Sequence, residues 1–374
     1  MIETDARTGL SDPRQLSRVL GNLPARTRGR EPISVMRIDI DQRDGVDDVH
    51  GPALEDQILP AVVETLRGSL SAGDTACRWG EEGFLVIRPS TALADAVSWS
   101  ERLREKVAAL RITHDGRAVP VTVSIGVVTR ASDGIGDEAI LASGQALSLA
   151  KRSGQNRVRT SEMALFAETV ARPEVARGSS AEERLGTVLE VSRERLGPTQ
   201  RDHLTSHSEY VSQFSTWIAP LVGLGPESVS HVRVAGLLHD IGKFAIPEAV
   251  LAKQTPLTGA ERALICRHTR DGTEMSLWLG ADPAAADYIH HHHTPFDGRG
   301  CVSGTRGEAI PLGGRILNVA DAFVSMTSHR PYRSARSFTA AVRELQRCCG
   351  TQFDPAVVEA VPRALLARAP GFVH

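Results

Sequence analysis

The feature that most restricts the fold is the segment LLHDIGK at residues 237–243, in which an apolar run ends in adjacent histidine and aspartate. The run predicts a buried helix, and polar groups at the end of a buried helix need partners. A histidine beside an aspartate suggests that the partner is a metal ion. Further His and Asp residues lie downstream, so the chain is expected to fold around a buried two-metal site.

Length and composition set the broad class. The chain has 374 residues, enough for two domains with full cores. A net charge of −2 gives no reason to expect a nucleic acid or a membrane surface as partner. No apolar run approaches the roughly 20 residues of a membrane span, and the N-terminal residues lack the features of a secretory signal. Five cysteines without a Cys-x-x-Cys pair fit reduced thiols, and a cytoplasmic protein is expected.

Hydrophobic patterning predicts an α/β domain over residues 1–160. Two β-like runs bracket a turn with glycine at residues 80 and 83, which is typical of a hairpin. Strands are expected at 33–40, 74–78, 84–88 and 119–128, and helices at 13–23, 54–70, 92–110 and 139–152.

The remaining chain predicts an all-α domain after a connection. A polar stretch with Pro, Gly and Ser reads as a linker, and a connecting helix follows, which together cover residues 161–198. Residues 199–374 lack β-branched alternation and show long helical periods instead. Helices are expected at 203–222, 226–240, 259–269, 283–292, 313–328 and 337–348.

Candidate metal ligands are spread over several of these expected helices. His203 and His207 are four residues apart and face the same direction. Asp321 lies inside an apolar helix, where a solvated role is hard to justify. Imidazoles with a few carboxylates suit Fe, Mn or Zn better than Mg or Ca. Two such ions can share Asp240 and activate water for attack on phosphorus, which predicts a metal-dependent phosphohydrolase.

Each candidate also has a purely structural interpretation. A single histidine on a helix is more often a hydrogen-bonded core residue than a ligand. The histidine run at 290–293 can be an exposed polar segment. Lys243 can compensate the carbonyl groups at a helix C-terminus. The joint pattern favours the metal site.

The second half resembles HD-GYP domains, which are cyclic di-GMP phosphodiesterases of the HD phosphohydrolase superfamily. The resemblance runs from about residue 206 to 358 and includes LLHDIGKFAIPEAVLAK (237–253), HHTPFDGRG (292–300), GEAIPLGGRILNVADAF (307–323), TSHRPYR (327–333) and GTQFDPAVV (350–358). It implies hydrolysis to linear pGpG, to GMP or to both, with two or three divalent metals, most typically Fe or Mn. It implies Asp240 and Lys243 as catalytic residues, and Lys243, Arg330 and Arg333 as groups that bind the phosphodiester. The implied metal ligands are His207, His239, Asp240, His268, His292, His293 and Asp321.

Several positions depart from the HD-GYP pattern. Gly300-Cys301-Val302 stands where the family has Gly-Tyr-Pro, and Thr294 replaces the Glu after the paired histidines. His203 falls where some members place a Glu that helps hold a third metal. It can be an additional ligand or a polar core residue, and both interpretations stay open. The altered loop also leaves open another cyclic dinucleotide or nucleotide ester as substrate. A non-catalytic nucleotide-binding signalling protein stays open as well, because the first half of the chain departs from an active enzyme.

The first half resembles GGDEF domains, which condense two GTP molecules into cyclic di-GMP. The resemblance covers about residues 5–160 and rests on the hairpin RWGEEGF (78–84), an Asp-x-x-Thr-Gly-Leu opening (5–10), RIDID (37–41), VSIGV (123–127) and AKRSGQNR (150–157). It implies a mostly antiparallel central sheet flanked by helices. The corresponding site residues are Asp39, Gly80, Glu81, Glu82 and Gly83.

The hairpin departs from an active cyclase. In an active hairpin the second glycine lets the backbone approach the nucleotide phosphates, and here Glu81 replaces it. Gly83 replaces the second acid. The phosphate-binding arginine becomes Gln155, although Lys151 remains. A cyclase-inactive domain is therefore expected. Asp39 and Glu82 can still hold Mg²⁺ with GTP, so a GTP-binding regulator and a module for homodimerisation both stay open.

Overall fold

The computed structural model describes residues 4–12, 31–41, 52–80, 83–132, 136–300, 304–328 and 334–368. Two compact units are present, and each is described by itself. The first runs to Leu165 and includes Thr258–Leu264, and the second comprises Phe166–Leu257 and the residues from Ile265 onward. Within the described ranges, no helix combines the length and apolar character that a membrane span needs.

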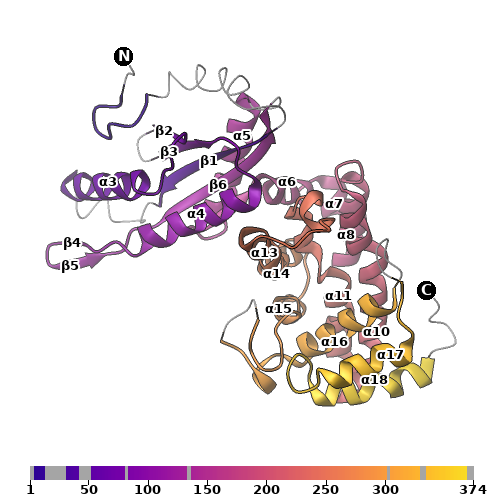
Figure 1. The fold of residues 1–374 in the computed structure, drawn as a ribbon. Helices are drawn as coiled ribbons and strands as arrows, with labels where there is room; N and C mark the ends of the chain where they lie inside the picture. Colours follow the sequence, from indigo (N-terminus) through magenta and orange to yellow (C-terminus); the bar gives the residue numbers. More distant parts are fainter. Residues whose placement is uncertain are drawn as a thin grey trace. The chain divides into compact units, whose positions relative to one another are not determined.

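The first unit is built on a five-stranded sheet with the order β2-β3-β1-β6-β7 (Figure 1). The strands are β1 (Pro32–Ile40), β2 (Thr75–Arg78), β3 (Gly83–Arg88), β6 (Val123–Ala131) and β7 (Val158–Thr160). β1 pairs antiparallel with both β3 and β6, and β6 pairs parallel with β7. β4 (Ile112–His114) and β5 (Arg117–Val119) form a separate hairpin. The predicted fold, a mostly antiparallel sheet flanked by helices, is confirmed.

Three helices of the first unit flank this sheet: α3 (Pro52–Arg67), α4 (Leu93–Ala108) and α5 (Asp137–Arg152). Helices α4 and α5 both pack against β6 and β1, and Figure 1 shows them on opposite sides of the sheet. β1 is therefore covered on both faces, and only Arg37 and Asp39 interrupt its buried interior. This alternation leaves two polar side chains on the face that α5 covers.

Two expectations for the first half differ from the structure. The strand expected at 119–128 is split, because Val119 ends β5 and β6 begins at Val123. Pro120 lies between them and has no N–H for a sheet ladder. The helix expected at 13–23 lies outside the described residues.

The segment expected as a linker is more ordered than its polar composition suggests. It contains α6 (Ser161–Val170), α7 (Pro173–Ala176) and α8 (Ala181–Val191). Phe166 and Val175 are buried, and the Phe166 ring lies 5.1 Å from that of Phe244. The burial of a few apolar side chains thus overrides the polar composition around them.

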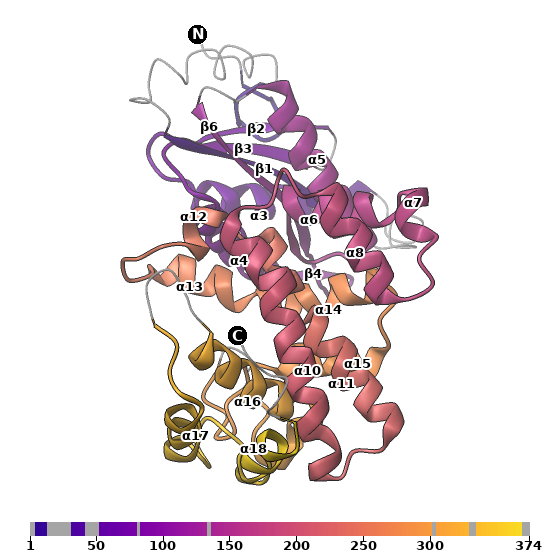
Figure 2. The ribbon, with the colours of Figure 1, turned by 90° about the vertical axis from the view of Figure 1, so that its right-hand side faces the viewer.

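The second unit is all-α, as predicted (Figure 2). Its core contains buried aromatic and aliphatic residues from α8 to α18, including Phe214 and Phe323, whose rings stack at 4.5 Å. The caps follow sequence rules: Asp282 and Ser337 each accept a backbone N–H at a helix start. Beyond α8, its described helical elements are α9 (Pro198–Asp202), η3 (His203–His207), α10 (Ser208–Ile218), η4 (Ala219–Val222), α11 (Pro226–Leu238), η5 (Ile241–Ala245), α12 (Glu248–Leu251), α14 (His268–Trp278), α15 (Pro283–His291), η6 (Gly307–Ala309), α16 (Leu312–Thr327), α17 (Phe338–Arg347) and α18 (Pro355–Arg368). Helix α13 (Gly259–Cys266) falls mostly in the segment assigned to the first unit.

The cysteines are not all thiols. Cys77, Cys348 and Cys349 are free, whereas Cys266 is disulfide-bonded. The expectation of reduced cysteines throughout is therefore wrong for Cys266. A sequence gives the number of sulfur atoms, but the fold decides which of them meet.

Candidate metal centre

Eight imidazole and carboxylate side chains from five parts of the second unit meet in one place. They form three overlapping groups, and within each group the ligand atoms lie within 4.8 Å of one another. Asp240 belongs to two groups, and so does His207. The groups are Asp240, His268, His292 and His293; His203, His207 and Asp240; and His207, His239 and Asp321. The structure thus brings together all the ligands expected from sequence, together with His203.

Helix ends and one helix interior supply these side chains. His203 and His207 lie on η3, a turn of π-helix between α9 and α10. His239 and Asp240 follow the last residue of α11, and His268 begins α14. His292 and His293 follow α15, whereas Asp321 lies within α16. A π-helical turn is rare and is often found at functional sites.

Gly242 permits the close packing behind the centre. A Cβ atom at this position would lie 2.1 Å from the carbonyl oxygen of His268. Glycine therefore lets η5, which carries Lys243, lie against the start of α14. The Gly in the HDIGK segment positions the two chain segments that provide Asp240 and His268.

The rings of three histidines are oriented by hydrogen bonds to backbone carbonyl groups of nearby residues. Nδ1 of His239, His268 and His292 lies 2.8, 2.5 and 2.7 Å from the carbonyl oxygens of Gly236, Ile265 and Ile289. A carbonyl oxygen only accepts, so Nδ1 carries the proton in each ring. The Nε2 lone pairs are then free to bind a metal ion, an arrangement typical of metal-ligating histidines.

Unpartnered atoms in the centre fit a bound cation. Nε2 of His239 and Oδ1 of Asp240 are buried and have no hydrogen-bond partner among the described residues. Nε2 of His268 lies 3.3 Å from Nε2 of His292, although both rings donate through Nδ1. Two lone pairs that face each other in a buried site need a positive charge between them or beside them. The residues present therefore fit divalent metal ions.

The electrostatics of the centre point the same way. Burial, and after it the neighbouring His293, lower the pKa of His268 to about 3. Burial also lowers the pKa values of His292 and His293, so these rings are neutral and able to bind metal. Burial opposes the charge of Asp240, but Lys243 and His239 hold the pKa of this carboxyl well below its ordinary value. The group of His268, His292 and His293 with an ionised Asp240 is thus a set of neutral imidazoles and one negative charge, which suits a cation.

Lys243 supplies one positive charge at the edge of the centre. Its Nζ atom lies 2.6 Å from Oδ2 of Asp240 and 3.2 Å from Nδ1 of His203. Nδ1 of His203 also lies 3.0 Å from Oδ2 of Asp240. His203 is thus in direct contact with the carboxylate of Asp240, a candidate metal ligand.

One group at the centre was missed by sequence reasoning. Ser325 donates its hydroxyl to Oδ1 of Asp321 at 3.1 Å, and Nε2 of His207 lies 3.0 Å from the same oxygen. The spacing of four residues on one helix is a signal that could have identified Ser325. Arg330, Arg333, Cys301 and Val302 lie outside the described residues.

Comparison with known proteins assigns both halves of the chain. The family model described as "HD domain" matches residues 194–357, and that described as "Diguanylate cyclase, GGDEF domain" matches residues 2–157. The chain is a GGDEF–HD tandem protein. Its HD domain implies binding of divalent metal, and the three groups above are where the described residues could hold it.

Curated relatives match part of the tandem protein. The chain is 39% identical over 162 residues to "Cyclic di-GMP phosphodiesterase response regulator RpfG" of Xanthomonas campestris, covering 41% of this chain and 42% of that protein. It is 36% identical over 161 residues to "Cyclic di-GMP phosphodiesterase" of Thermotoga maritima, with the same shares. It is 31% identical over 159 residues to "3'3'-cGAMP-specific phosphodiesterase 1" of Vibrio cholerae, covering 42% and 37%. The match thus spans less than half the length of each relative.

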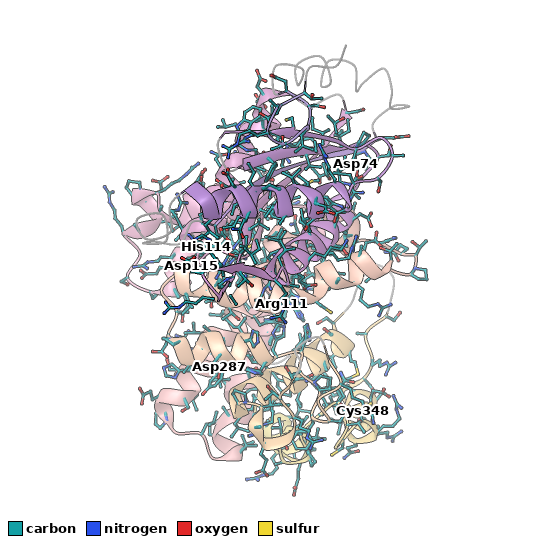
Figure 3. All side chains as sticks on the ribbon, turned by 90° about the vertical axis from the view of Figure 1, so that its left-hand side faces the viewer. Asp74, Arg111, His114, Asp115, Asp287 and Cys348 are labelled. Carbon is teal, nitrogen blue, oxygen red and sulfur yellow. The ribbon has the colours of Figure 1, made fainter. Side chains whose placement is uncertain are left out.

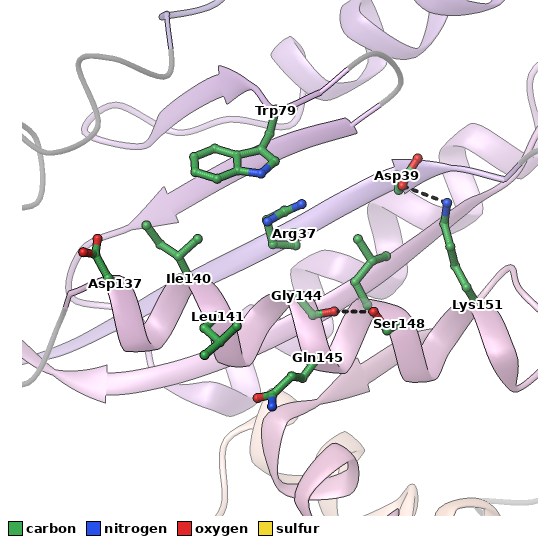
Figure 4. A pocket seen from close by; sticks show the side chains of 11 residues that line it. Arg37, Asp39, Trp79, Asp137, Ile140, Leu141, Gly144, Gln145, Ser148 and Lys151 are labelled. Atoms are coloured by element: carbon green, nitrogen blue, oxygen red, sulfur yellow. Dashed lines mark hydrogen bonds and ion pairs between the residues drawn. The ribbon is translucent and has the colours of Figure 1, made fainter. Parts of the chain in front are cut away.

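The GGDEF domain has a hollow of about 680 Å³ beside its expected site (Figure 4). Arg37 and Asp39 of β1 line it, together with Trp79 and several residues of α5. The Arg37 guanidinium lies 4.9 Å from the centre of the Trp79 ring. Nζ of Lys151 lies 2.7 Å from Oδ2 of Asp39, so the expected magnesium ligand is paired with the expected phosphate ligand. Glu81 and Glu82 lie outside the described residues.

The position of Gly83 explains part of the departure from an active hairpin. It pairs with Asp39 across β1 and β3. A Cβ atom at Gly83 would lie 2.5 Å from the carbonyl oxygen of Trp79 and 3.2 Å from that of Ile38. The backbone of this chain therefore leaves no room for the second acid of the family's turn.

Two further carboxylates of the GGDEF domain are engaged internally. Asp41 accepts hydrogen bonds from the side chains of Thr122 and Ser124 and from the backbone N–H of Asn156. Asp74, on the face shown in Figure 3, accepts a hydrogen bond from Nε of Arg88 at 3.1 Å. Both carboxylates thus serve the fold in this structure.

Proposed function

We propose that the HD domain hydrolyses cyclic di-GMP to linear pGpG, to GMP or to both. The single observation that carries the proposal is the set of three overlapping ligand groups that share Asp240 and His207. Two relatives named as cyclic di-GMP phosphodiesterases support this choice of substrate.

The proposed centre holds two divalent ions: imidazoles with a few carboxylates suit Fe, Mn or Zn, and the resemblance to HD-GYP domains favours Fe or Mn among these. His268, His292 and His293 with Asp240 would hold one ion, and His239 and Asp321 with His207 would hold the other. His203 lies in the group that would take a third ion. When bound, the ions polarise the phosphodiester and lower the pKa of water that attacks it.

The chain's own residues would position the substrate and balance its charge. Lys243 is mostly buried, and its ammonium group lies at the edge of the ligand set. There it can donate to a non-bridging phosphate oxygen, where an ammonium group favours the charge that develops during hydrolysis. Arg330 and Arg333 remain predicted partners of the phosphodiester, since a guanidinium fork matches phosphate oxygens.

Lys243→Met tests this role. We expect turnover of cyclic di-GMP to fall by about 100- to 1,000-fold, as for other residues that stabilise developing charge. Metal content should stay at the wild-type level, because Lys243 is not a metal ligand. Chromatographic assay and elemental analysis measure the two quantities, with Lys253→Met as the matched control. A variant that loses its metals together with its activity would contradict the proposed role.

A second candidate substrate is 3'3'-cGAMP. The observation that favours it is the match to a phosphodiesterase named as specific for this dinucleotide, together with the altered loop Gly300-Cys301-Val302. A panel of cyclic dinucleotides with anaerobically purified, Mn- or Fe-loaded protein distinguishes the two by kcat/KM. Absence of turnover for the whole panel, with metal bound, would favour another nucleotide ester or a non-catalytic signalling protein.

For the GGDEF domain we propose a regulatory or dimerising role without cyclase activity. Replacement of a glycine by Glu81 and of an acid by Gly83 supports the loss of activity. Asp39 and Lys151, which form an ion pair, are retained as groups that could bind Mg²⁺ and phosphate, so the proposal includes GTP binding. Sedimentation with and without GTP tests whether the protein forms a homodimer.

We expect no cyclic di-GMP from GTP and Mg²⁺, even from the double variant Glu81→Gly with Gly83→Glu. The side chain at residue 83 must displace the Trp79 carbonyl, and Gln155 still lacks the positive charge for phosphate. Such overpacking typically costs about 1–3 kcal/mol of stability. Chromatography of the products and thermal unfolding measure both effects, with Glu81→Gly alone as control. Cyclic di-GMP formed by the wild-type protein would overturn the proposed inactivity.

A further inference from the structure

A buried glutamine outside the ligand set joins two segments that carry metal ligands. Gln200 is 6% exposed and lies on α9, three residues before His203. Its Nε2 atom donates to the carbonyl oxygens of Phe244 and Ile246 at 3.2 and 2.9 Å, and lies 3.3 Å from that of Lys243. One amide thus contacts three carbonyl oxygens at the end of η5 and just after it, of which that of Lys243 also accepts the backbone N–H of Ile246.

A carboxylate makes the same connection in the opposite direction. Glu248, the first residue of α12, accepts the backbone N–H of Thr199 at 2.9 Å and that of Gln200 at 3.1 Å. These are N–H groups in the first turn of α9, where a negative charge is favourable. Burial opposes this charge, but the hydrogen bonds from Thr199 and Gln200 keep the pKa of Glu248 below its ordinary value.

The two connections link the segments that must meet at the metal centre. α9 continues without interruption into η3, which carries His203 and His207. η5 follows Asp240 directly and carries Lys243. A helical segment moves as a unit, so a shift of α9 relative to η5 would displace the η3 histidines from the ligands on α11 and α16. A displacement of a few tenths of an ångström matters, because metal–nitrogen distances are narrowly defined.

We propose that Gln200 and Glu248 are positioning residues that set the metal affinity of the groups containing His207. The inference rests on the proposed metal function of the HD domain. It makes a selective prediction, because the group Asp240, His268, His292 and His293 contains no residue of η3. We call the two connections made by Gln200 and Glu248 the clamp. Loss of the clamp should weaken the binding of the ions that His207 helps to hold, and the remaining ion should stay tightly bound.

The test is a Mn²⁺ titration of the metal-stripped full-length protein, without substrate. In Gln200→Met, the affinity of one ion should stay at the wild-type value and that of the other should fall by about 10- to 100-fold, as for other residues that orient metal ligands. Glu248→Ala should give the same pattern, and Glu248→Gln should recover part of the loss because its amide oxygen still accepts one N–H. Gln254→Leu, at an exposed glutamine, is the matched control.

The outcomes separate positioning from a general structural role. If Gln200 and Glu248 only stabilise the fold, their substitution should lower the thermal midpoint of the metal-free protein. It should then reduce the affinity for all ions alike, or leave the affinity of the folded protein unchanged for every ion. Either result overturns the positioning role. A selective loss of affinity for one ion supports the proposal. If the loss in the Gln200→Met, Glu248→Ala double variant is not the sum of the two single losses, the two residues act as one unit. A wild-type protein that binds no Mn²⁺ overturns the proposed metal function itself, and the positioning role with it.

Discussion

Asp240→Asn should reduce turnover of cyclic di-GMP by at least about 1,000-fold, beyond the roughly 10- to 100-fold typical of residues that only orient a ligand. Asp240 belongs to two of the three ligand groups, that of the first proposed ion and that with His203, which would take a third ion, so its loss affects both of these positions. Asn keeps the volume but removes the charge and one of the carboxylate oxygens that two ions would share. Chromatography of the products and elemental analysis should show the loss of activity and of metal together.

Asp287→Asn is the matched control for this experiment. Asp287 is exposed on α15 of the same domain and lies on the molecular surface (Figure 3). This variant should keep wild-type turnover and metal content. Circular dichroism establishes that both variants fold. An Asp240→Asn protein that retains activity would show that the chemistry does not depend on this centre.

Removal of the metals should abolish turnover and also lower the stability of the HD domain. Without cations, the buried carboxylate of Asp240 and the half-buried carboxylate of Asp321 lose a source of compensating charge, which is costly. An ion present at one hundred times its Kd stabilises the folded state by about 2.7 kcal/mol. At roughly 2–4 °C for each kcal/mol in a unit of this size, the thermal midpoint should fall by about 5–10 °C for each ion lost.

Calorimetry before and after treatment with a chelator measures this shift, and added Mn²⁺ or Fe²⁺ should restore both midpoint and turnover. The Asp240→Asn protein serves as control, because a chelator should change its midpoint much less. Full activity after verified removal of the metals would contradict the proposed mechanism.

The sequence predicted the class of both halves, since short-range periodicity carries that information. The buried run of β1 and the Gly-bounded hairpin between β2 and β3 were read from alternation and turn residues. The helical periods of the second half gave α11, α15 and α16 within a few residues. Helix α6 was missed, because the burial of Phe166 depends on partners such as Phe244 that are distant in the chain.

For the metal centre, residue types and spacings identified the candidate ligands, since a histidine next to an aspartate at the end of an apolar helix has few other uses. The tertiary structure decided which candidate ligands lie close enough together to share an ion, because that depends on how η3, α11, α14, α15 and α16 meet. It also decided the orientation of each imidazole through backbone carbonyls such as that of Gly236.

The sequence by itself therefore determined two domain classes, a set of candidate metal ligands and a GGDEF-like hairpin in which Glu81 and Gly83 replace a glycine and an acid of the family's turn. Only the tertiary structure decided that Gly83 has no room for a side chain, that Cys266 is disulfide-bonded, and that Gln200 and Glu248 connect α9 to η5. The physical reason is the range of the interactions. Periodicity and motifs are local along the chain, whereas close packing and buried hydrogen bonds join residues more than forty positions apart.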